Sequence, residues 1–287
     1  MPNHFPFVTS LWLFQHIHDT NLVILDGSWY LPAMMRDPEN EFRKAHIPNA
    51  IRFDIDIVKD HNNPLPHMLP TEKKFVQAVE NMGISQNSTI VIYDGSGLFS
   101  APRVWWTFKV FGAQNVFILE GGFPKWQSEK RPIETGEQRS PAPQEFVPRF
   151  ASDKVVNWKQ VQDISNSCLY EIVDARGKER FLGIAPDIRP GVRAGHIPHS
   201  VNLPFDHLII DGTLAPKDII QKEFDALGID LKKPFIVSCG SGVTASVLAL
   251  AAYTVSGQLP MLYDGSWSEW GARTDLPIEI GEAKNIL

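Results

Sequence analysis

The architecture of this chain can be predicted from an apolar run that ends in a glycine turn, Phe235-Ile236-Val237-Ser238-Cys239-Gly240-Ser241-Gly242. The run shows no polar alternation, which is typical of a strand that is buried on both faces of a parallel sheet. The residues after the turn, Ala245–Tyr253, have the composition of a buried helix. A strand, a turn and a helix in this order form the basic unit of an α/β protein.

The same pattern occurs earlier in the chain, where Asp94 stands in place of Cys239 at an offset of 145 residues. Matches in the same order at nearly one offset indicate two homologous halves. Three features recur in this way: the glycine turns after Asp94 and Cys239, the His-Ile-Pro turns at His46 and His196, and the apolar runs that end in Asp26 and Asp174.

The repeat predicts an α/β fold with two tandem domains, each a mostly parallel central sheet flanked by helices. We place the domains at residues 1–130 and 151–287 and a linker at residues 131–150, because that stretch has four prolines and no apolar period. Helices are expected to end at Gly83 and Gly228. The expected strands include Leu22–Asp26, Ala50–Phe53, Val116–Leu119, Ile172–Asp174, Val201–Leu203 and Met261–Tyr263.

The composition limits the classes of function. A formal net charge of −6 argues against a broad nucleic-acid surface, and no apolar run is long enough to predict a membrane span. The two cysteines, Cys168 and Cys239, cannot form a disulfide framework, and their spacing does not predict a zinc site. Together with an N-terminus that lacks a targeting pattern, this favours a reducing, cytoplasmic setting.

The glycine turn is compatible with more than one chemistry. Gly240–Ala245 fits the GxGxxA pattern of a dinucleotide site, with Asp264 about 20 residues further on. The position near the end of the chain argues against that interpretation. A cysteine phosphatase loop would need an arginine where Ala245 stands, and a P-loop would need a lysine after the glycines.

A nucleophilic Cys239 is the third interpretation. A thiol between converging N–H groups and a helix N-terminus has a lowered pKa, and the same groups solvate a thiolate or a persulfide. The backbone of Gly240, Gly242, Val243 and Thr244 is therefore expected to hold the anionic sulfur. Cys168 is expected to open a strand and to be structural. Asp94 cannot act as a sulfur nucleophile, so the first half is expected to be non-catalytic.

These residues resemble a known family. The run Cys239–Ala245 is similar to the active loop of the 3-mercaptopyruvate sulfurtransferases, members of the rhodanese superfamily. The resemblance to this family extends over nearly the whole chain. Thiosulfate-using rhodaneses carry basic residues where Gly240 and Ser241 stand. Other segments that resemble the family are Asp26–Tyr30, the two His-Ile-Pro turns, Tyr93–Ser96 and Ala101–Trp106.

The resemblance implies a C-terminal catalytic domain that transfers sulfur from 3-mercaptopyruvate through a Cys239 persulfide. It implies that Arg180 and Arg189 bind the donor's carboxylate, and that Asp37, His46 and Ser241 form a relay. Guanidinium groups suit this task because they bind carboxylates bidentately. The expected acceptor is a thiol such as thioredoxin or a small thiol, or cyanide in an assay. No metal or organic cofactor, nucleic acid or membrane is expected to take part.

Three alternatives remain open from the sequence. One is a thiosulfate sulfurtransferase, and a more distant one is a nucleotide-binding oxidoreductase that uses the GxGxxA turn. The third is a sulfide-binding protein in which Cys239 reacts without turnover.

Overall fold

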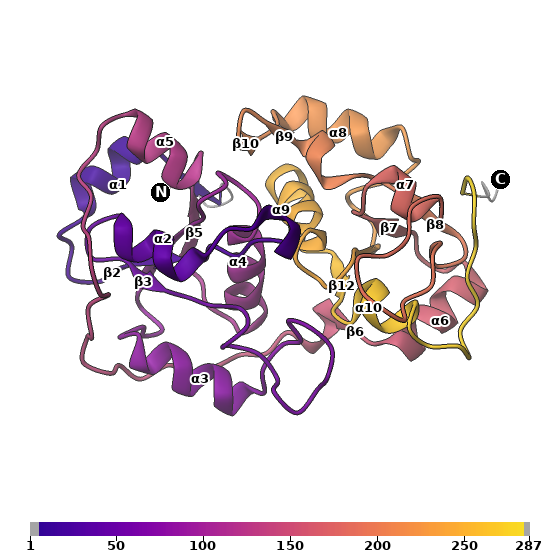
Figure 1. Ribbon diagram of the computed structural model, residues 1–287, viewed down its shortest axis with the longest axis horizontal. Helices are drawn as coiled ribbons and strands as arrows, with labels where there is room; N and C mark the ends of the chain where they lie inside the picture. Colours follow the sequence, from indigo (N-terminus) through magenta and orange to yellow (C-terminus); the bar gives the residue numbers. More distant parts are fainter. Residues whose placement is uncertain (1–5, 284–287) are drawn as a thin grey trace. The chain divides into compact units, whose positions relative to one another are not determined.

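The computed structural model describes residues 6–283, which form two units (Figure 1). Unit 1 comprises the described residues up to His61, Leu69–Ala151 and Asp211–Leu214. Unit 2 comprises Asn62–Met68, Ser152–Ile210 and the described residues from Ala215 onward. Each unit thus receives one short segment from the other half of the sequence.

The expected linker, residues 131–150, packs against unit 1. Phe146 in this stretch is buried, and its ring meets the ring of Phe75 edge-on at 5.7 Å between centroids. Residues 131–150 therefore belong to the first domain as a packed extension.

Unit 1 contains a five-stranded parallel sheet with the strand order β1-β5-β4-β2-β3. Helices flank the sheet, and buried side chains from α1, α2 and α5 join one core with β2 and β4. The elements are β1 (Phe7–Val8), α1 (Ser10–His16), β2 (Leu22–Asp26), α2 (Pro38–Lys44), β3 (Ile51–Arg52), α3 (Glu72–Asn81), β4 (Thr89–Tyr93), α4 (Ala101–Val110), β5 (Val116–Leu119) and α5 (Gly122–Ser128).

Unit 2 repeats this arrangement, with a five-stranded parallel sheet in the order β6-β12-β11-β7-β8. Its elements are β6 (Val155–Val156), α6 (Trp158–Ser167), β7 (Ile172–Asp174), α7 (Lys178–Phe181), β8 (Ser200–Asn202), α8 (Lys217–Asp225), β11 (Ile236–Ser238), α9 (Ala245–Ser256), β12 (Met261–Tyr263) and α10 (Ser266–Trp270). Two further strands, β9 (Ile209–Ile210) and β10 (Thr213–Leu214), form a separate hairpin.

The predicted fold class is confirmed, including the two mostly parallel sheets flanked by helices. The runs predicted as strands are buried where the sheet covers both faces, as in β2, whose five residues are all buried. The amphipathic helix α3 is capped by Met82, and Gly83 follows with a φ of +69°, a conformation that glycine adopts at little cost.

Candidate active site

Cys239 lies directly after β11, the central strand of the unit 2 sheet, and directly before the glycine turn that leads into α9. Its side chain is only 1% exposed. In open parallel sheets, ligands bind at the carboxyl ends of central strands. The cysteine therefore lies where this type of fold places its chemistry.

The turn after Cys239 presents several backbone donors that have no partner among the described residues. Its residues are almost all buried, and a buried N–H group without a partner is unfavourable. Converging donors of this kind at the start of a helix bind anions. Within residues 6–283, no hydrogen bond engages the backbone N–H groups of Gly240, Ser241, Val243, Thr244 and Ala245.

Unit 1 shows what the same turn does with an anion in place. The buried Asp94 carboxylate accepts the N–H of Ser96 at 2.9 Å through Oδ1. Its Oδ2 accepts the N–H groups of Phe99, Ser100 and Ala101 at 2.7–2.8 Å. Asp94 matches Cys239 in the repeat, so the turn in each unit is built to surround a negative charge. Unit 1 supplies that charge from its own chain.

Two arginines reach the turn beside Cys239. A Cβ atom on Gly240 would lie 3.3 Å from Arg189 Nη1 and 3.5 Å from Arg180 Nη2, so both guanidinium groups border this residue. Each arginine side chain is 24% exposed. Arg180 Nε is buried and has no hydrogen-bond partner in the described chain, which leaves it available to a ligand.

Asp187 holds the two arginines and was not anticipated from the sequence. Its carboxylate, 2% exposed, accepts a hydrogen bond from Arg180 Nη2 at 2.6 Å and lies 3.9 Å from Arg189 Nη1. Burial lowers the pKa of Arg189, while Asp187 and Cys239 counteract this effect by favouring its charged form. Two guanidinium groups and one carboxylate leave a net positive charge beside the turn.

The structure also identifies the histidine that contacts Ser241. His67 Nδ1 lies 3.1 Å from Ser241 Oγ, and the ring is 4% exposed. The family resemblance implied His46 at this place, and within residues 6–283 the histidine hydrogen-bonded to Ser241 is His67. The signal in the sequence is the long irregular stretch between β3 and α3 that carries His67, because such loops in compact domains are commonly functional.

Asp37 and His46 have other roles in unit 1. Asp37 caps α2, with Oδ1 accepting the Asn40 N–H at 3.0 Å. The buried His46 donates from Nδ1 to the Phe42 carbonyl at 2.7 Å, and its Nε2 faces Glu134 at 3.7 Å. Both ring nitrogens therefore face partners inside unit 1, as expected for a structural histidine.

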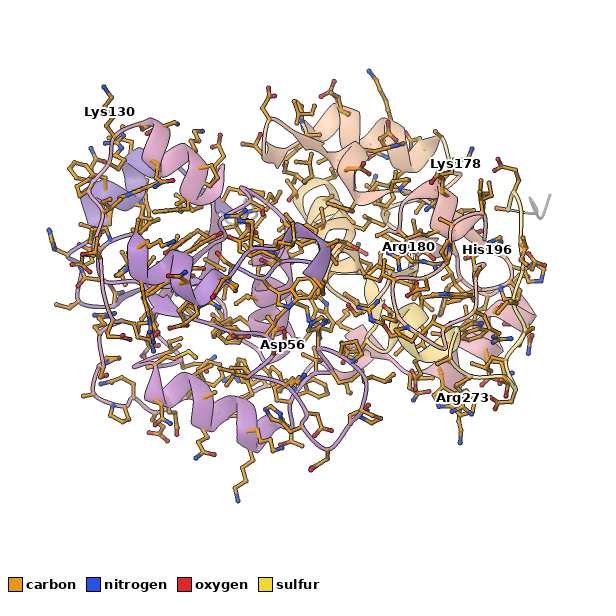
Figure 2. The ribbon with its side chains drawn as sticks, viewed as in Figure 1. Asp56, Lys130, Lys178, Arg180, His196 and Arg273 are labelled. Carbon is orange, nitrogen blue, oxygen red and sulfur yellow. The ribbon has the colours of Figure 1, made fainter. Side chains whose placement is uncertain are left out.

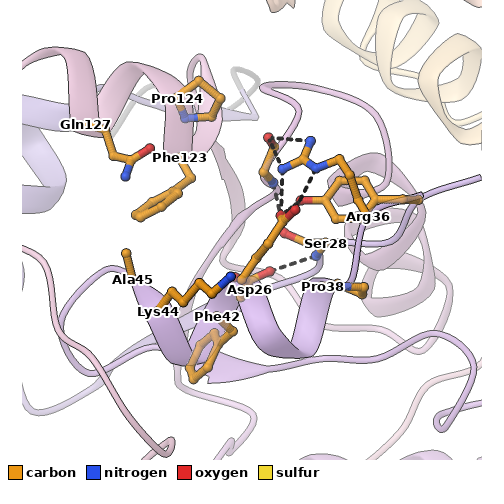
Figure 3. A pocket seen from close by; sticks show the side chains of 13 residues that line it. Asp26, Ser28, Arg36, Pro38, Phe42, Lys44, Ala45, Phe123, Pro124 and Gln127 are labelled. Carbon is orange, nitrogen blue, oxygen red and sulfur yellow. Dashed lines mark hydrogen bonds and ion pairs between the residues drawn. The ribbon is translucent and has the colours of Figure 1, made fainter. Parts of the chain in front are cut away.

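A pocket of about 260 Å³ occupies part of unit 1, between α2 and α5 (Figure 3). Its central group is Glu41, which binds Arg36 through two hydrogen bonds of 2.6–2.8 Å and Tyr30 through one of 2.7 Å. Glu41 precedes Phe42 as Arg180 precedes Phe181. The position that carries a cation in unit 2 thus carries an anion in unit 1, which does not suit a carboxylate ligand.

Cys168 is not part of a strand. It ends α6 in a left-handed conformation with a φ of +52°, and it is exposed.

Residues 6–283 contain no helix that is both long and apolar enough to cross a membrane. In the same residues, the His, Cys, Asp and Glu side chains form no group of three or more that could bind a metal ion.

Comparison with known proteins connects this site to a family. A model described as a rhodanese-like domain matches residues 9–129 and 157–273. The 3-mercaptopyruvate sulfurtransferase of Escherichia coli is 42% identical over 274 residues, which are 95% of this chain and 97% of the relative. An Arabidopsis thaliana protein named thiosulfate/3-mercaptopyruvate sulfurtransferase 1, mitochondrial, is 38% identical over 301 residues, 98% of this chain and 79% of the relative.

The fold agrees with these matches. The crystal structure of SseA from Escherichia coli, a 3-mercaptopyruvate sulfotransferase, superposes with a TM-score of 0.84 and 38% identity and covers 92% of this chain and 99% of SseA. The Gly240–Ala245 turn lies inside the second matched range, so the dinucleotide interpretation is not retained. The chain therefore belongs to the rhodanese family and carries two rhodanese-like domains in tandem.

Proposed function

We propose that this chain is a 3-mercaptopyruvate sulfurtransferase in which Cys239 carries the sulfur between donor and acceptor. The observation that carries the proposal is the buried set of unused N–H groups around Cys239, with Arg180 and Arg189 at its border. The N–H groups suit an anionic sulfur, and the two guanidinium groups suit the carboxylate of an α-keto acid. The names of the relatives support the same donor.

In the first half-reaction, the Cys239 thiolate attacks the sulfur of 3-mercaptopyruvate. A sulfur–sulfur bond forms and the bond from sulfur to C3 breaks, with its electron pair moving to C3. The resulting pyruvate enolate takes up a proton and leaves as pyruvate. Cys239 now holds a persulfide, whose negative charge is stabilised by the N–H groups of residues 240–244.

In the second half-reaction, an acceptor thiolate attacks the outer sulfur of the persulfide. The sulfur–sulfur bond breaks, its electron pair returns to Cys239, and the acceptor leaves as a persulfide. Thioredoxin, a small thiol or, in an assay, cyanide can play this part. The sulfur atom and both electron pairs come from the donor, the acceptor and Cys239, so the two half-reactions need no cofactor.

We assign the proton that the enolate requires to the pair Ser241 and His67. The Ser241 hydroxyl belongs to the turn itself and lies within hydrogen-bond distance of the His67 ring. A hydroxyl bonded to an imidazole can pass on a proton and be reprotonated. In this proposal His67 takes the place that the sequence analysis gave to His46.

The direct test compares kcat/KM for 3-mercaptopyruvate and thiosulfate. Thiosulfate brings a dianion to a thiolate, and one charge pair near 4 Å costs on the order of 4 kcal/mol at an effective dielectric constant of about 20. Mercaptopyruvate keeps its charge away from its sulfur, so the native enzyme is expected to prefer it. Replacing Gly240 and Ser241 with Arg and Lys should shift the ratio toward thiosulfate by more than Ser241→Ala does, because Ser241→Ala removes the same hydroxyl without adding charge.

A native enzyme that prefers thiosulfate would favour the second candidate function, which the two-donor name of the Arabidopsis relative supports. A ratio that does not change in the double variant would mean that charge in the turn does not control donor choice. A reactive Cys239 without turnover on either donor would leave sulfide binding as the function.

Arg180→Ala and Arg189→Ala are each expected to weaken the use of mercaptopyruvate. Loss of a charge-assisted hydrogen bond to a carboxylate costs about 1.5–3 kcal/mol, or roughly 10- to 150-fold in kcat/KM. Arg→Lys should restore only part of this loss, because the planar fork is missing.

Arg273→Ala is a suitable control for the loss of one positive charge from unit 2. Arg273 binds Asp275 at 2.7 Å and stacks on Trp158, outside the turn. Native kinetics in the Arg180 and Arg189 variants would remove both residues from the donor site.

The proposed compartment is the cytoplasm. Both cysteines are free thiols, and a nucleophilic Cys239 requires a reducing setting. The Arabidopsis relative is named as a mitochondrial protein, so localisation of the tagged chain in cells is the experiment that separates the two compartments.

A further inference from the structure

The two units share a second repeat, which lies after the last helix of each. Its pattern is Pro-Ile-Glu-x-Gly-Glu, at residues 132–137 and again at residues 277–282. In each unit a tryptophan of that helix donates to the proline carbonyl at 2.7 Å, from Trp126 to Pro132 and from Trp270 to Pro277. The segment after each proline then returns to the His-Ile-Pro turn of its own unit.

In unit 2 the returning segment is Glu279–Glu282, which we call the C-terminal strap. Glu279 and His196 exchange two backbone hydrogen bonds of 2.9 and 3.0 Å. The Gly281 N–H then donates to the Leu182 carbonyl at 2.9 Å, directly after α7. Figure 2 shows Lys178 on α7, and its ammonium group lies 3.1 Å from the carboxylate of Glu282. The strap thus contacts α7 at both ends.

The helix that the strap contacts carries Arg180, and it cannot hold itself in place. α7 has four residues and no side-chain cap at its N-terminus, so little of its order comes from its own hydrogen bonds. External contacts replace them: His196 donates from Nδ1 to the Phe181 carbonyl at 2.8 Å and stacks on the Phe181 ring at 3.9 Å. Burial lowers the pKa of His196, which keeps this ring neutral at pH 7.

We propose that the C-terminal strap, fastened to His196, positions Arg180 and thereby sets the affinity of the enzyme for the carboxylate of its sulfur donor. This inference rests on the proposed function, in which Arg180 binds that carboxylate. The strap is a positioning element because it acts through the backbone of α7 and does not touch the reacting atoms.

Unit 1 offers a matched control within the same molecule. There the Gly136 N–H donates to the Arg43 carbonyl at 2.8 Å, directly after Phe42, and His46 binds and stacks on Phe42 as His196 does on Phe181. Gly136 has a φ of +98° and Gly281 a φ of +92°, and an added Cβ would meet nothing within 4 Å at either residue. Gly136 and Gly281 therefore differ mainly in the helix that their N–H group contacts, which is α2 in unit 1 and α7 in unit 2.

The test is a comparison of Gly281→Pro with Gly136→Pro. Proline removes the N–H donor at each position and cannot adopt a positive φ, so both variants detach the same contact in their unit. Gly281→Pro is expected to raise KM for 3-mercaptopyruvate by about 3- to 10-fold with little change in kcat, and to raise KM for thiosulfate less, because thiosulfate has no carboxylate for Arg180 to bind. Gly136→Pro is expected to leave both KM values unchanged.

The milder pair Gly281→Ala and Gly136→Ala keeps the N–H group and serves if a proline variant does not fold. Its expected effect has the same direction and is smaller. An unchanged KM in a folded Gly281 variant, or an equal change for both donors, would overturn the inference. So would an equal effect at Gly136, because general loosening of the protein would then explain it.

Arg180→Ala separates this inference from the function on which it rests. If that variant leaves KM for mercaptopyruvate unchanged, the carboxylate assignment itself fails. If it raises KM and Gly281→Pro does not, only the role of the strap fails. In the Arg180→Ala background, Gly281→Pro should add no further increase in KM, because residues that act through one another are not additive.

Discussion

Cys239→Ser is expected to abolish sulfur transfer from 3-mercaptopyruvate, with kcat falling by a factor on the order of 10⁴ or more. A serine alkoxide forms far less readily than a thiolate at neutral pH, so the turn would have no nucleophile to stabilise. The fold should remain intact, because the two side chains have similar size. Mass spectrometry after incubation with donor measures the result directly, since the native enzyme should gain one sulfur atom and the variant none.

Cys168→Ser is the matched control, because it removes the other free thiol, which is exposed at the end of α6. It should keep nearly full activity and still gain one sulfur atom. Loss of activity in this variant, together with an active Cys239→Ser protein, would reverse the assignment of the nucleophile.

Asp94→Ala is expected to produce the largest loss of stability. The carboxylate is fully buried and accepts four backbone N–H groups, all of which would lose their partner. Removing a buried carboxylate from its hydrogen-bonded N–H groups lowers the free energy of unfolding by about 3–5 kcal/mol, because the N–H groups stay buried without a partner. The measurements are the midpoint of urea unfolding and the hydrogen exchange of the Phe99, Ser100 and Ala101 amides, which should lose their protection.

Cys239→Ala is the control for this experiment, since it shortens the matching side chain in unit 2. Within residues 6–283, the N–H groups of Gly240, Ser241, Val243, Thr244 and Ala245 have no hydrogen-bond partner in the native protein, so shortening Cys239 breaks no hydrogen bond at these five groups. The variant should lose much less stability than Asp94→Ala. Equal losses would mean that the Asp94 carboxylate does not stabilise its turn more than Cys239 does.

Four interior strands of the two sheets could be predicted to the residue from the sequence, whereas β11 begins one residue later than the apolar run, at Ile236. β2, β5, β7 and β12 have the expected bounds, because a strand between two neighbours in a parallel sheet is a continuous apolar run. The edge strands agree less well: Ile51–Arg52 is shorter than expected, and Ser200–Asn202 is displaced by one residue. Strands at an edge pair on one side only, so the apolar pattern constrains their ends less.

In the candidate site, too, some residues could be predicted from the sequence and others could not. The turn after Cys239 could be recognised because a glycine-rich strand–helix junction is local in sequence. Asp187 and His67 could not, because their roles depend on how irregular loops return to the turn. The family resemblance placed His46 in the relay, whereas the structure surrounds its buried ring with Phe42 and Glu134 of unit 1.

The two turns also differ in when their negative charge is present. The Asp94 carboxylate is a fixed part of the unit 1 turn, whereas in the proposed function the unit 2 turn gains its anionic group when Cys239 becomes a persulfide. Whatever binds the folded state alone adds to the free energy of unfolding. Under the proposed function, the stability of unit 2 therefore varies over the reaction cycle, while that of unit 1 does not. If Cys239 carries the sulfur as proposed, scarcity of the sulfur donor is expected to lower the free energy of unfolding of unit 2 as well as slow the reaction.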